Sequence, residues 1–383
     1  MVKIKKTYQE LEKEKNFKQI MILLKKKRIT TKSDLSIKLN LSVPTVTKII
    51  NEMLEMGIIF ESELFESTGG RKALSYEFVP DSLLSIGVKI ELNFLQLALI
   101  NLDGKIIKRK IIEKNFIENL EILDILTTEI QFFIFEIGIF SSKVQGIGIS
   151  VPGIIDNNEL ILKIGTNFKL YNIDFESIQK TLKYKVIIEN EANAACFAEF
   201  SNMRVRKSIL VISIGTGIGA GIILEGIPYK GSHRKAGEIG HITLYPHGKK
   251  CNCGNEGCWE MYCSNTAIID EFNKEFGNIK SLKDVFNKKI ITTEMGQKLL
   301  DSYIENLSIG IKDLLLIFDC DKIVISGEIC NYSKHIKSKI DQILFDKDVF
   351  YKDETKKLEF SDYREDANLI GAGLLAFKNY LVL

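Results

Sequence analysis

The sequence of 383 residues lacks the features that mark membrane and secreted proteins. Its longest apolar stretches, such as residues 132–139, are interrupted by charged residues like Glu136 and are too short to span a bilayer. The basic start at residues 1–6 is not followed by the apolar core and small-residue cleavage site of a signal peptide. With five prolines and no low-complexity tract, the sequence also has no stiff linker. We therefore expect a cytoplasmic protein with no membrane partner.

The seven cysteines are not expected to form a disulfide framework. A cytoplasmic chain keeps its thiols reduced, and three of the seven cysteines lie within eight residues, which indicates a metal site. One imidazole and three thiolates are the donor set that zinc prefers, in a closed tetrahedral geometry with no position for an activated water. The alternative is a group of buried free thiols. We predict a structural Zn²⁺ site formed by His241, Cys251, Cys253 and Cys258.

Positive charge is concentrated near the N-terminus. Residues 1–50 contain 13 Lys or Arg and 4 Asp or Glu, a net charge of +9, so the rest of the chain carries −7 of the overall +2. A basic end on a mildly acidic remainder points to a nucleic-acid or membrane contact. The alternative is a solvated Lys-rich surface. A chain of this length is also expected to fold as two or three domains.

The N-terminal region contains three predicted helices. Residues 16–27 place apolar side chains on one face, and Thr31 or Ser33 is suited to cap a second helix. Ser42 is suited to cap a third helix, with Pro44 in its first turn. In this arrangement two helices are followed by a short turn and a third helix with a polar outer face. It is typical of proteins whose recognition helix enters a major groove. The predicted DNA-contacting residues of that face are Thr45, Thr47, Lys48 and Asn51.

A predicted β-hairpin follows the third helix. Its strands are residues 58–66 and 74–79, and the paired glycines between them let the backbone approach a ligand closely. An arginine beside such a tip is suited to contact phosphates or a minor groove. The alternative is a small three-helix module that binds protein. Together with the basic charge, the hairpin predicts a winged helix that binds double-stranded DNA, with wing contacts at Gly69, Gly70 and Arg71.

The remainder of the chain uses one pattern of secondary structure twice. Predicted strands at residues 84–88, 94–102 and 105–112 precede a long apolar helix near residues 120–140. A second strand and hairpin at residues 208–224 lead through a Gly- and Cys-rich loop into further helices. This repetition suggests a duplicated α/β fold whose two halves enclose a ligand cleft.

Two segments of the Gly- and Cys-rich loop form a long composite motif. They are Ala-Gly-Glu-Ile-Gly-His at residues 236–241 and Cys-Asn-Cys-Gly-Asn-Glu-Gly-Cys-Trp-Glu at residues 251–260. The motif resembles the signature of the ROK family, which contains bacterial sugar repressors and sugar kinases. The resemblance implies an α/β protein with an N-terminal winged helix-turn-helix and a two-subdomain actin-like fold of the ribonuclease H and sugar-kinase type. The expected domains are a DNA-binding domain at 1–80, a first actin-like subdomain at 81–190 completed by 368–383, and a second subdomain with the zinc loop at 191–367.

The same resemblance implies a sugar site. Asn-Glu-Ala-Asn-Ala-Ala at residues 190–195 is similar to the family's Asn-Asp-x-Asn-Ala-Ala segment, whose Asn and acidic residue contact the sugar. Carboxylates and amides suit this role because they pair with neighbouring hydroxyls. A zinc-bound His would face the sugar with its other ring nitrogen, and the ion would hold the loop that carries the carboxylates. For any single Glu the alternative is a surface residue. The predicted sugar-binding residues are Asn190, Glu191, Glu238, His241 and Glu260.

One of the two phosphate-binding elements of a kinase is lost. The Gly-rich residues 215–221 remain, although a tight hairpin in a core needs such glycines equally. Kinases of the family begin the domain with an Asp followed by Gly-Gly-Thr, whereas here Lys89 replaces the Asp and residues 91–93 are Glu-Leu-Asn. These side chains fill the space of the phosphates, and Glu91 repels them. Glu191 in place of the catalytic Asp decides nothing by itself. We expect that the protein is not an enzyme.

These observations predict a sugar-responsive transcriptional repressor of carbohydrate uptake or catabolism genes, similar to the xylose-repressor branch of the family. Its expected partners are double-stranded operator DNA and a small sugar, and one recognition helix per chain implies a homodimer or a tetramer. Release of DNA by the sugar is a family expectation that no residue shows. One alternative is an ATP-dependent sugar kinase that carries a DNA-binding domain. Another is a zinc-dependent scaffold with a protein-binding N-terminal module.

Overall fold

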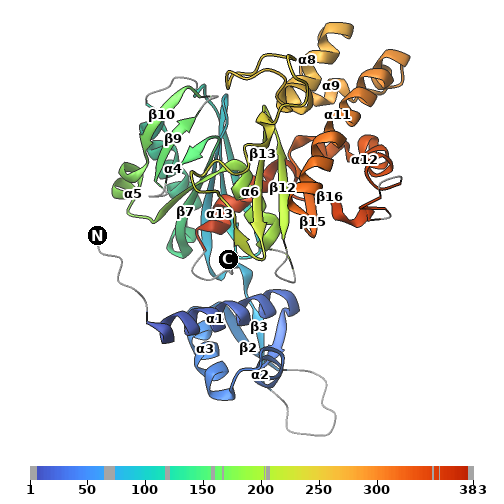
Figure 1. The fold of residues 1–383 in the computed structure, drawn as a ribbon. Helices are drawn as coiled ribbons and strands as arrows, with labels where there is room; N and C mark the ends of the chain where they lie inside the picture. The colour runs from blue at the N-terminus through green and yellow to red at the C-terminus, as the bar shows by residue number, and fades with distance from the viewer. Residues whose placement is uncertain are drawn as a thin grey trace.

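The protein has two parts, which we call the head (residues 8–78) and the body (residues 84–377) and which Figure 1 shows one below the other. Among the residues that the structure describes, no helix has the length and apolar character that a bilayer crossing requires. The computed structural model describes residues 7–63, 74–116, 121–156, 160–165, 168–201, 203, 208–346, 349–352 and 354–377.

The head consists of three helices and a three-stranded antiparallel sheet of order β1-β3-β2. Its core forms because Val46, Ile49, Ile50 and Met53 recur on one face of α3 and are buried. The elements are α1 (Tyr8–Lys27), β1 (Ile29–Thr31), α2 (Lys32–Leu39), α3 (Val43–Glu55), β2 (Ile59–Glu63) and β3 (Leu74–Phe78).

Local hydrogen bonds set where the helices of the head begin. The Ser42 hydroxyl accepts from the backbone N–H of Thr45 at 3.3 Å, which confirms the predicted N-cap of α3. α1 starts earlier than the predicted residue 16. The reason is a capping box, in which the Thr7 N–H donates to the Glu10 carboxylate at 2.8 Å and the Glu10 N–H donates to the Thr7 hydroxyl at 3.3 Å.

The body contains two five-stranded sheets with the same topology. The first sheet has the order β11-β7-β4-β5-β6 and the second sheet the order β16-β15-β12-β13-β14. The central strand is β4 in the first sheet and β12 in the second. On one side of it lie two strands joined by antiparallel pairing, and on the other side lie two strands joined by parallel pairing. The strands are β4 (Leu84–Ile90), β5 (Phe94–Asn101), β6 (Ile106–Glu113), β7 (Val144–Val151), β11 (Val186–Asn190), β12 (Ile209–Ile214), β13 (Ile218–Leu224), β14 (Ile227–Pro228), β15 (Lys322–Ser326) and β16 (Leu358–Phe360).

Two helices lie between the sheets and interlock them. α6 (Glu191–Ser201) follows the first sheet but packs on β12 and β13, whereas α13 (Ala367–Leu375) follows the second sheet but packs on β4, β5 and β7. The two helices also pack against each other, and α13 lies at the centre of the body in Figure 1. Their approach is close, since a Cβ atom on Gly371 would lie 1.7 Å from the carbonyl oxygen of Ala194.

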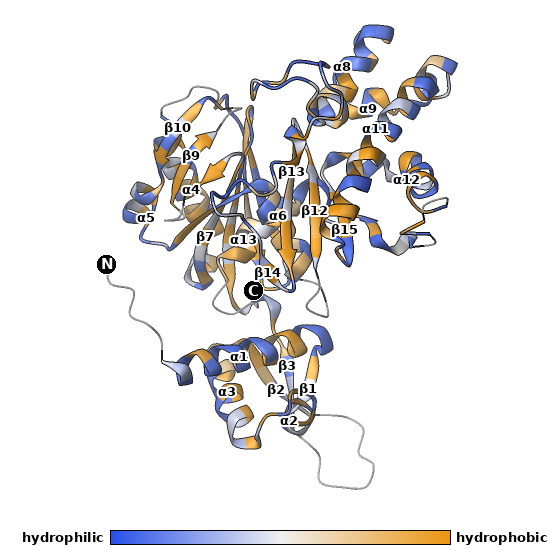
Figure 2. Ribbon diagram, viewed as in Figure 1, coloured by the Kyte–Doolittle hydropathy of each residue, from blue (hydrophilic) through white to orange (hydrophobic). Residues whose placement is uncertain are grey.

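The outer faces of the two sheets are covered by the remaining elements. Apolar side chains of α4 and α5 pack with the first sheet, and those of α8, α11 and α12 pack with the second. Figure 2 shows the strands of both sheets largely in the colour of hydrophobic residues, because both faces of the central strands are covered, whereas the edge strands β6 and β14 are mostly exposed. These elements are α4 (Ile122–Ile137), β8 (Ile154–Ile155), β9 (Ile161–Gly165), β10 (Leu170–Asp174), α5 (Glu176–Leu182), α7 (Glu260–Cys263), α8 (Asn265–Phe276), α9 (Leu282–Val285), α10 (Lys288–Ile291), α11 (Glu294–Phe318) and α12 (Ser333–Asp341).

Candidate functional site

A pocket lies between the two sheets, where β7 and β11 end and the β12–β13 hairpin turns. Glycines keep its walls open, since a Cβ atom on Gly217 would lie 2.7 Å from a carboxylate oxygen of Glu260. A cleft between two α/β halves is a common place for a small ligand. The structure brings all five predicted sugar-binding residues to this pocket: Asn190, Glu191, Glu238, His241 and Glu260.

Asn190 is held at the pocket wall by three hydrogen bonds. Its side-chain oxygen accepts from the backbone N–H groups of Ala192 at 2.9 Å and Asn193 at 3.2 Å, so it caps the start of α6. Its side-chain nitrogen donates to the Gly153 carbonyl at 3.0 Å. An amide nitrogen has two N–H donors, so one is left for a ligand.

Glu191 is the first residue of α6 and is half-buried in the pocket. Burial and the negative charge of Glu91 raise the pKa of Glu191 to about 8. The carboxylates of Glu238 and Glu260 act in the same direction, and the ammonium of Lys89 opposes them. A carboxyl group with this pKa is mostly protonated at neutral pH. It can therefore donate one hydrogen bond and accept another.

Three charged residues of the pocket were not predicted from the sequence. Glu189 is buried, pairs with the ammonium of Lys230 and accepts from the Asn193 side-chain amide at 3.2 Å. Arg234 also lines the pocket. Lys230 and Arg234 lie just before the motif at residues 236–241, and Glu189 directly precedes Asn190. The closeness of these three residues to the motifs in the sequence could have identified them as pocket residues.

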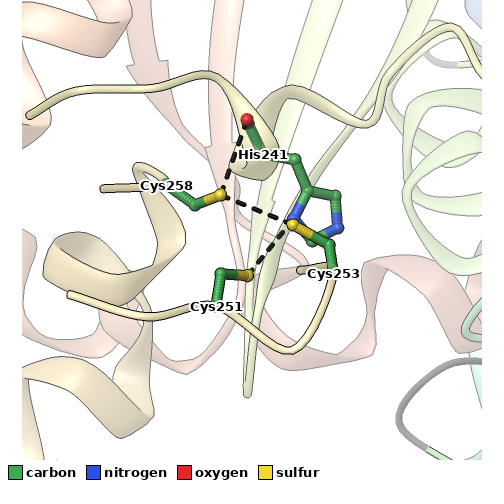
Figure 3. Close-up of side chains that lie close together, drawn as sticks. All are labelled: His241, Cys251, Cys253 and Cys258. Carbon is green, nitrogen blue, oxygen red and sulfur yellow. Dashed lines mark hydrogen bonds between the residues drawn. The ribbon is translucent and has the colours of Figure 1, made fainter. Parts of the chain in front are cut away.

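The predicted metal ligands form one cluster (Figure 3). The donor atoms of His241, Cys251, Cys253 and Cys258 all lie within 4.8 Å of one another. The Sγ atoms of Cys253 and Cys258 are 3.6 Å apart, as are Cys251 Sγ and His241 Nδ1. A tetrahedral ion with bonds of about 2.3 Å separates its ligand atoms by roughly 3.8 Å. The cluster therefore has the donors and the spacing to hold a metal ion.

The cluster and the pocket share residues. His241 turns Nδ1 toward the thiols, and its Nε2 lies 3.8 Å from a carboxylate oxygen of Glu238. On the other side, Glu260 accepts from the Cys251 thiol at 3.0 Å. Any ion held by the cluster would thereby fix two side chains of the pocket in place.

A second cavity lies beyond Glu191, which lines both cavities. At its wall the Lys89 ammonium forms an ion pair with Glu91 at 3.0 Å and donates to the Glu365 carbonyl at 3.1 Å. The Lys89 side chain is only 9% exposed. The residues at the end of β4 are thus bonded to one another and to the segment that precedes α13.

The recognition helix presents part of its predicted DNA face. Lys48 and Asn51 are exposed, and Thr47 is half-buried. Thr45 is half-buried and its hydroxyl forms a 2.8 Å hydrogen bond with the Ser42 hydroxyl, so it also contributes to the cap. The predicted wing residues Gly69, Gly70 and Arg71 lie outside the described residues.

Among the residues that the structure describes, head and body meet through an apolar cluster and an ion pair. The cluster includes Phe78 of the head, Phe197 of α6 and Leu374 of α13. Beside it, the Arg28 guanidinium, at the end of α1, bonds Asp103 in the β5–β6 turn at 2.6 Å. Movement of α6 or α13 would therefore shift the residues at the base of the head.

Comparison with known proteins gives a consistent result. The model of the ROK family matches residues 85–379, and a model described as winged helix-turn-helix DNA-binding matches residues 16–59. The chain is 31% identical to a xylose repressor of Bacillus spizizenii over 326 residues, 84% of each protein. Among solved structures, a ROK family transcriptional regulator described as a homologue of the Escherichia coli MLC protein aligns with a TM-score of 0.79 at 24% identity, over 97% of each chain. A ROK family glucokinase from Streptomyces griseus, in complex with glucose and AMPPNP, aligns with a TM-score of 0.66 at 20% identity, over 77% of this chain and 99% of its own.

Proposed function

Because this chain belongs to the ROK family, we propose that it is a sugar-responsive transcriptional repressor. The head binds operator DNA and the pocket of the body binds a small sugar. The observation that carries the proposal is that one chain joins a recognition helix to a pocket lined by five side chains suited to sugar hydroxyls. The similarity to a xylose repressor makes D-xylose the first sugar to test and genes of carbohydrate uptake or catabolism the expected targets.

In the proposed sugar site, each polar side chain has a distinct role. Asn190 offers its remaining N–H donor, and Glu191 both donates and accepts. Glu238 and Glu260 accept from hydroxyls, and the Nε2 side of His241 faces the same space. Desolvated hydroxyls require such partners, because an unpaired buried polar group is costly.

We propose that the cysteine cluster holds a structural Zn²⁺ ion, with His241, Cys251, Cys253 and Cys258 as its four ligands. Protein atoms would fill all four positions, so the ion would supply rigidity and no chemistry. What supports the proposal is the donor set and the 3.6 Å spacing of its atoms. The consequence for function is a fixed loop that presents Glu260 and His241 to the sugar.

The sugar signal would travel along α6. This helix begins at the pocket with Glu191, and Ala194, Phe197 and Ala198 farther along it belong to the apolar cluster shared with the head. A sugar that contacts both sheets favours a closed arrangement of the body. We propose that residues 1–80 form the DNA-binding domain and that the body consists of two subdomains. When these subdomains close on each other, the DNA-binding domain would rotate.

DNA recognition is proposed for the exposed face of α3, with Thr45, Thr47, Lys48 and Asn51 as contacts and the wing residues Gly69, Gly70 and Arg71 beside them. One such helix covers a half-site, so a homodimer on a palindromic operator is the expected assembly, with a tetramer as its larger form. Closing of the body would change the spacing of the two recognition helices. This would lower the affinity for the operator.

The alternative is a sugar kinase that also binds DNA, which the likeness to a glucokinase structure favours. Against it stand Lys89, which replaces the Asp of the family's kinases, and Glu91, which replaces one of their glycines; the two side chains form an ion pair. We therefore propose that the protein is not an enzyme. A coupled assay of ATP consumption over a panel of aldoses separates the two functions, because sustained turnover would contradict the sensor.

The direct test is fluorescence anisotropy with labelled DNA from upstream of the chain's own gene and its neighbours. The full chain should bind one fragment with a steep dependence on salt, and D-xylose or another sugar should release it. Lys48→Ala should weaken binding to all fragments, with Lys180→Ala on the outer surface of the body as a control. A chain that binds none of the fragments would point to a protein-binding head.

A further inference from the structure

An ion pair at the wall of the pocket joins the two sheets of the body. Glu189 lies on β11, an edge strand of the first sheet, and Lys230 follows shortly after β14, an edge strand of the second. Their side chains are paired, and both residues line the pocket. The pair therefore connects the two halves at the place where the proposed ligand binds.

The carboxylate of Glu189 is buried and bonds three groups. One oxygen accepts from the backbone N–H of Asn190 at 3.1 Å and from the side-chain amide of Asn193 at 3.2 Å, and the other accepts from the Lys230 ammonium. The Glu189 side chain is only 11% exposed. Separation from Lys230 would leave this charge buried without a counter-charge, which is strongly unfavourable.

The backbone around Lys230 is tied to β13 of the second sheet. The Tyr229 N–H donates to the Ile222 carbonyl at 2.8 Å, and the Ala220 N–H donates to the Gly237 carbonyl at 2.7 Å. Contact at the second point is close, since a Cβ atom on Gly237 would lie 2.0 Å from the Ala220 carbonyl oxygen. A segment held to β13 on both sides of Lys230 moves with the second sheet. Separation of the sheets would therefore stretch the ion pair.

The arrangement that forms the ion pair also assembles the proposed sugar site. Asn190 directly follows Glu189, whereas Glu238 and His241 lie in the segment that follows Lys230. These side chains share one pocket only while the two halves are close together. The fraction of chains in this arrangement sets the apparent affinity for the ligand.

We propose that Glu189 and Lys230 form a latch, an ion pair that holds the two halves together around the sugar without contacting it. The inference rests on the proposed function and adds two positioning residues to its site. A broken latch favours the open arrangement, which in the proposed function is the one that binds the operator. It should therefore weaken sugar binding and strengthen operator binding together, whereas loss of a direct sugar contact would weaken sugar binding alone.

The first test removes the ammonium with Lys230→Met in the full chain. In calorimetry with D-xylose, D-glucose and N-acetylglucosamine, the sugar that binds the parent should bind on the order of 10-fold more weakly, and sugar-free operator binding should become about 3-fold tighter in anisotropy. Lys230→Arg keeps the charge and should retain both affinities. The control is Lys322→Met, because that lysine is similarly exposed but pairs with Glu359 within the second sheet. Unchanged affinities in Lys230→Met would overturn the latch.

A double-mutant cycle separates the latch from a direct contact between Lys230 and the sugar. Glu189→Gln keeps an acceptor for the Asn193 amide but removes the charge that Lys230 pairs with. Adding Lys230→Met to this variant should cost less than about 3-fold in further sugar affinity, because the pair is already broken. A further loss as large as that in the parent chain would assign Lys230 to the sugar and overturn the latch.

Small-angle X-ray scattering tests the latch without sugar or DNA. Lys230→Met and Glu189→Gln should each have a larger radius of gyration than the parent chain, and Lys322→Met should not. Equal radii in folded chains, with folding checked by circular dichroism, would overturn the latch and leave the proposed function intact. A parent chain that binds none of the sugars and no operator fragment would contradict the proposed function, and the scattering would still decide the latch.

Discussion

The two sheets of the body share one strand order but differ at their first hairpin turn. In the first sheet the turn between β4 and β5 begins with Glu91, which is bonded to Lys89. In the second sheet the turn between β12 and β13 is Gly-Thr-Gly at residues 215–217, and a Cβ atom on Gly215 would have no atom within 4 Å. A duplicated fold can therefore close one copy of a turn with side chains and keep the other copy open. The chemistry of a cleft can change in one half alone.

The largest expected effect concerns how firmly the halves are joined. Gly371→Ala should lower the free energy of unfolding by about 3 kcal/mol, because its Cβ atom would lie 1.7 Å from the Ala194 carbonyl oxygen and the helices must move apart. Gly215→Ala makes the same chemical change in open space and should leave stability almost unchanged. Thermal unfolding followed by circular dichroism measures both. Equal losses in the two variants would show that the halves are not held by this contact.

A second effect tests whether the cysteine cluster serves the pocket. Cys258→Ser should remove bound zinc and weaken sugar binding by about 10- to 100-fold, since the loop that carries Glu260 and His241 loses its anchor. Zinc content by mass spectrometry and sugar affinity by calorimetry are the two measurements. Cys330→Ser, a buried thiol beside the second sheet and outside the cluster, is the control. Undiminished sugar affinity in a zinc-free chain would separate the cluster from the pocket.

A third effect concerns Glu191, which stands between the halves. Its pKa is about 8 in the folded chain and near the ordinary value of 4.5 when unfolded, so the folded state holds the proton more tightly. Its contribution to stability therefore becomes more unfavourable as the pH rises from 4.5 to 8 and is constant above that. Glu191→Gln removes this term and should be more stable than the parent chain by about 1–3 kcal/mol at pH 9, with little difference at pH 4.5. A difference in unfolding temperature that does not grow with pH would contradict the raised pKa.

The smallest effect distinguishes the two sheets by their contact with the head. Asp103→Asn breaks the ion pair with Arg28 and should change the free energy of sugar-induced operator release by less than about 1 kcal/mol, with sugar affinity unchanged. Glu225→Gln lies at the corresponding turn of the second sheet, between β13 and β14, and serves as the matched control. Operator titrations with and without sugar measure the coupling. Equal shifts in both variants would mean that the first sheet has no special link to the head.

Short-range features were predictable from the sequence and long-range pairings were not. The N-cap Ser42 bonds a residue three positions away, and the periodic apolar face of α3 needs only local spacing. The composite motif and the separate family-like segment at residues 190–195 placed the five pocket residues together, because family resemblance carries tertiary information. In contrast, Lys89 bonds the Glu365 carbonyl 276 residues away, and Lys230 pairs with Glu189 across 41 residues. Such contacts depend on how separate elements meet, which no local pattern encodes.

The exchange of helices between the sheets has a consequence for biosynthesis. The first sheet is built from residues 84–190, yet the helix that covers its inner face comes from residues 367–375. During translation the head can fold as soon as the chain up to residue 78 has emerged, whereas β4, β5 and β7 lack this cover until the chain is almost finished. A nascent chain therefore exposes apolar strand surface for most of its synthesis, and truncation before residue 367 would leave that surface open permanently. The DNA-binding part of the molecule is thus formed well before the part that controls it.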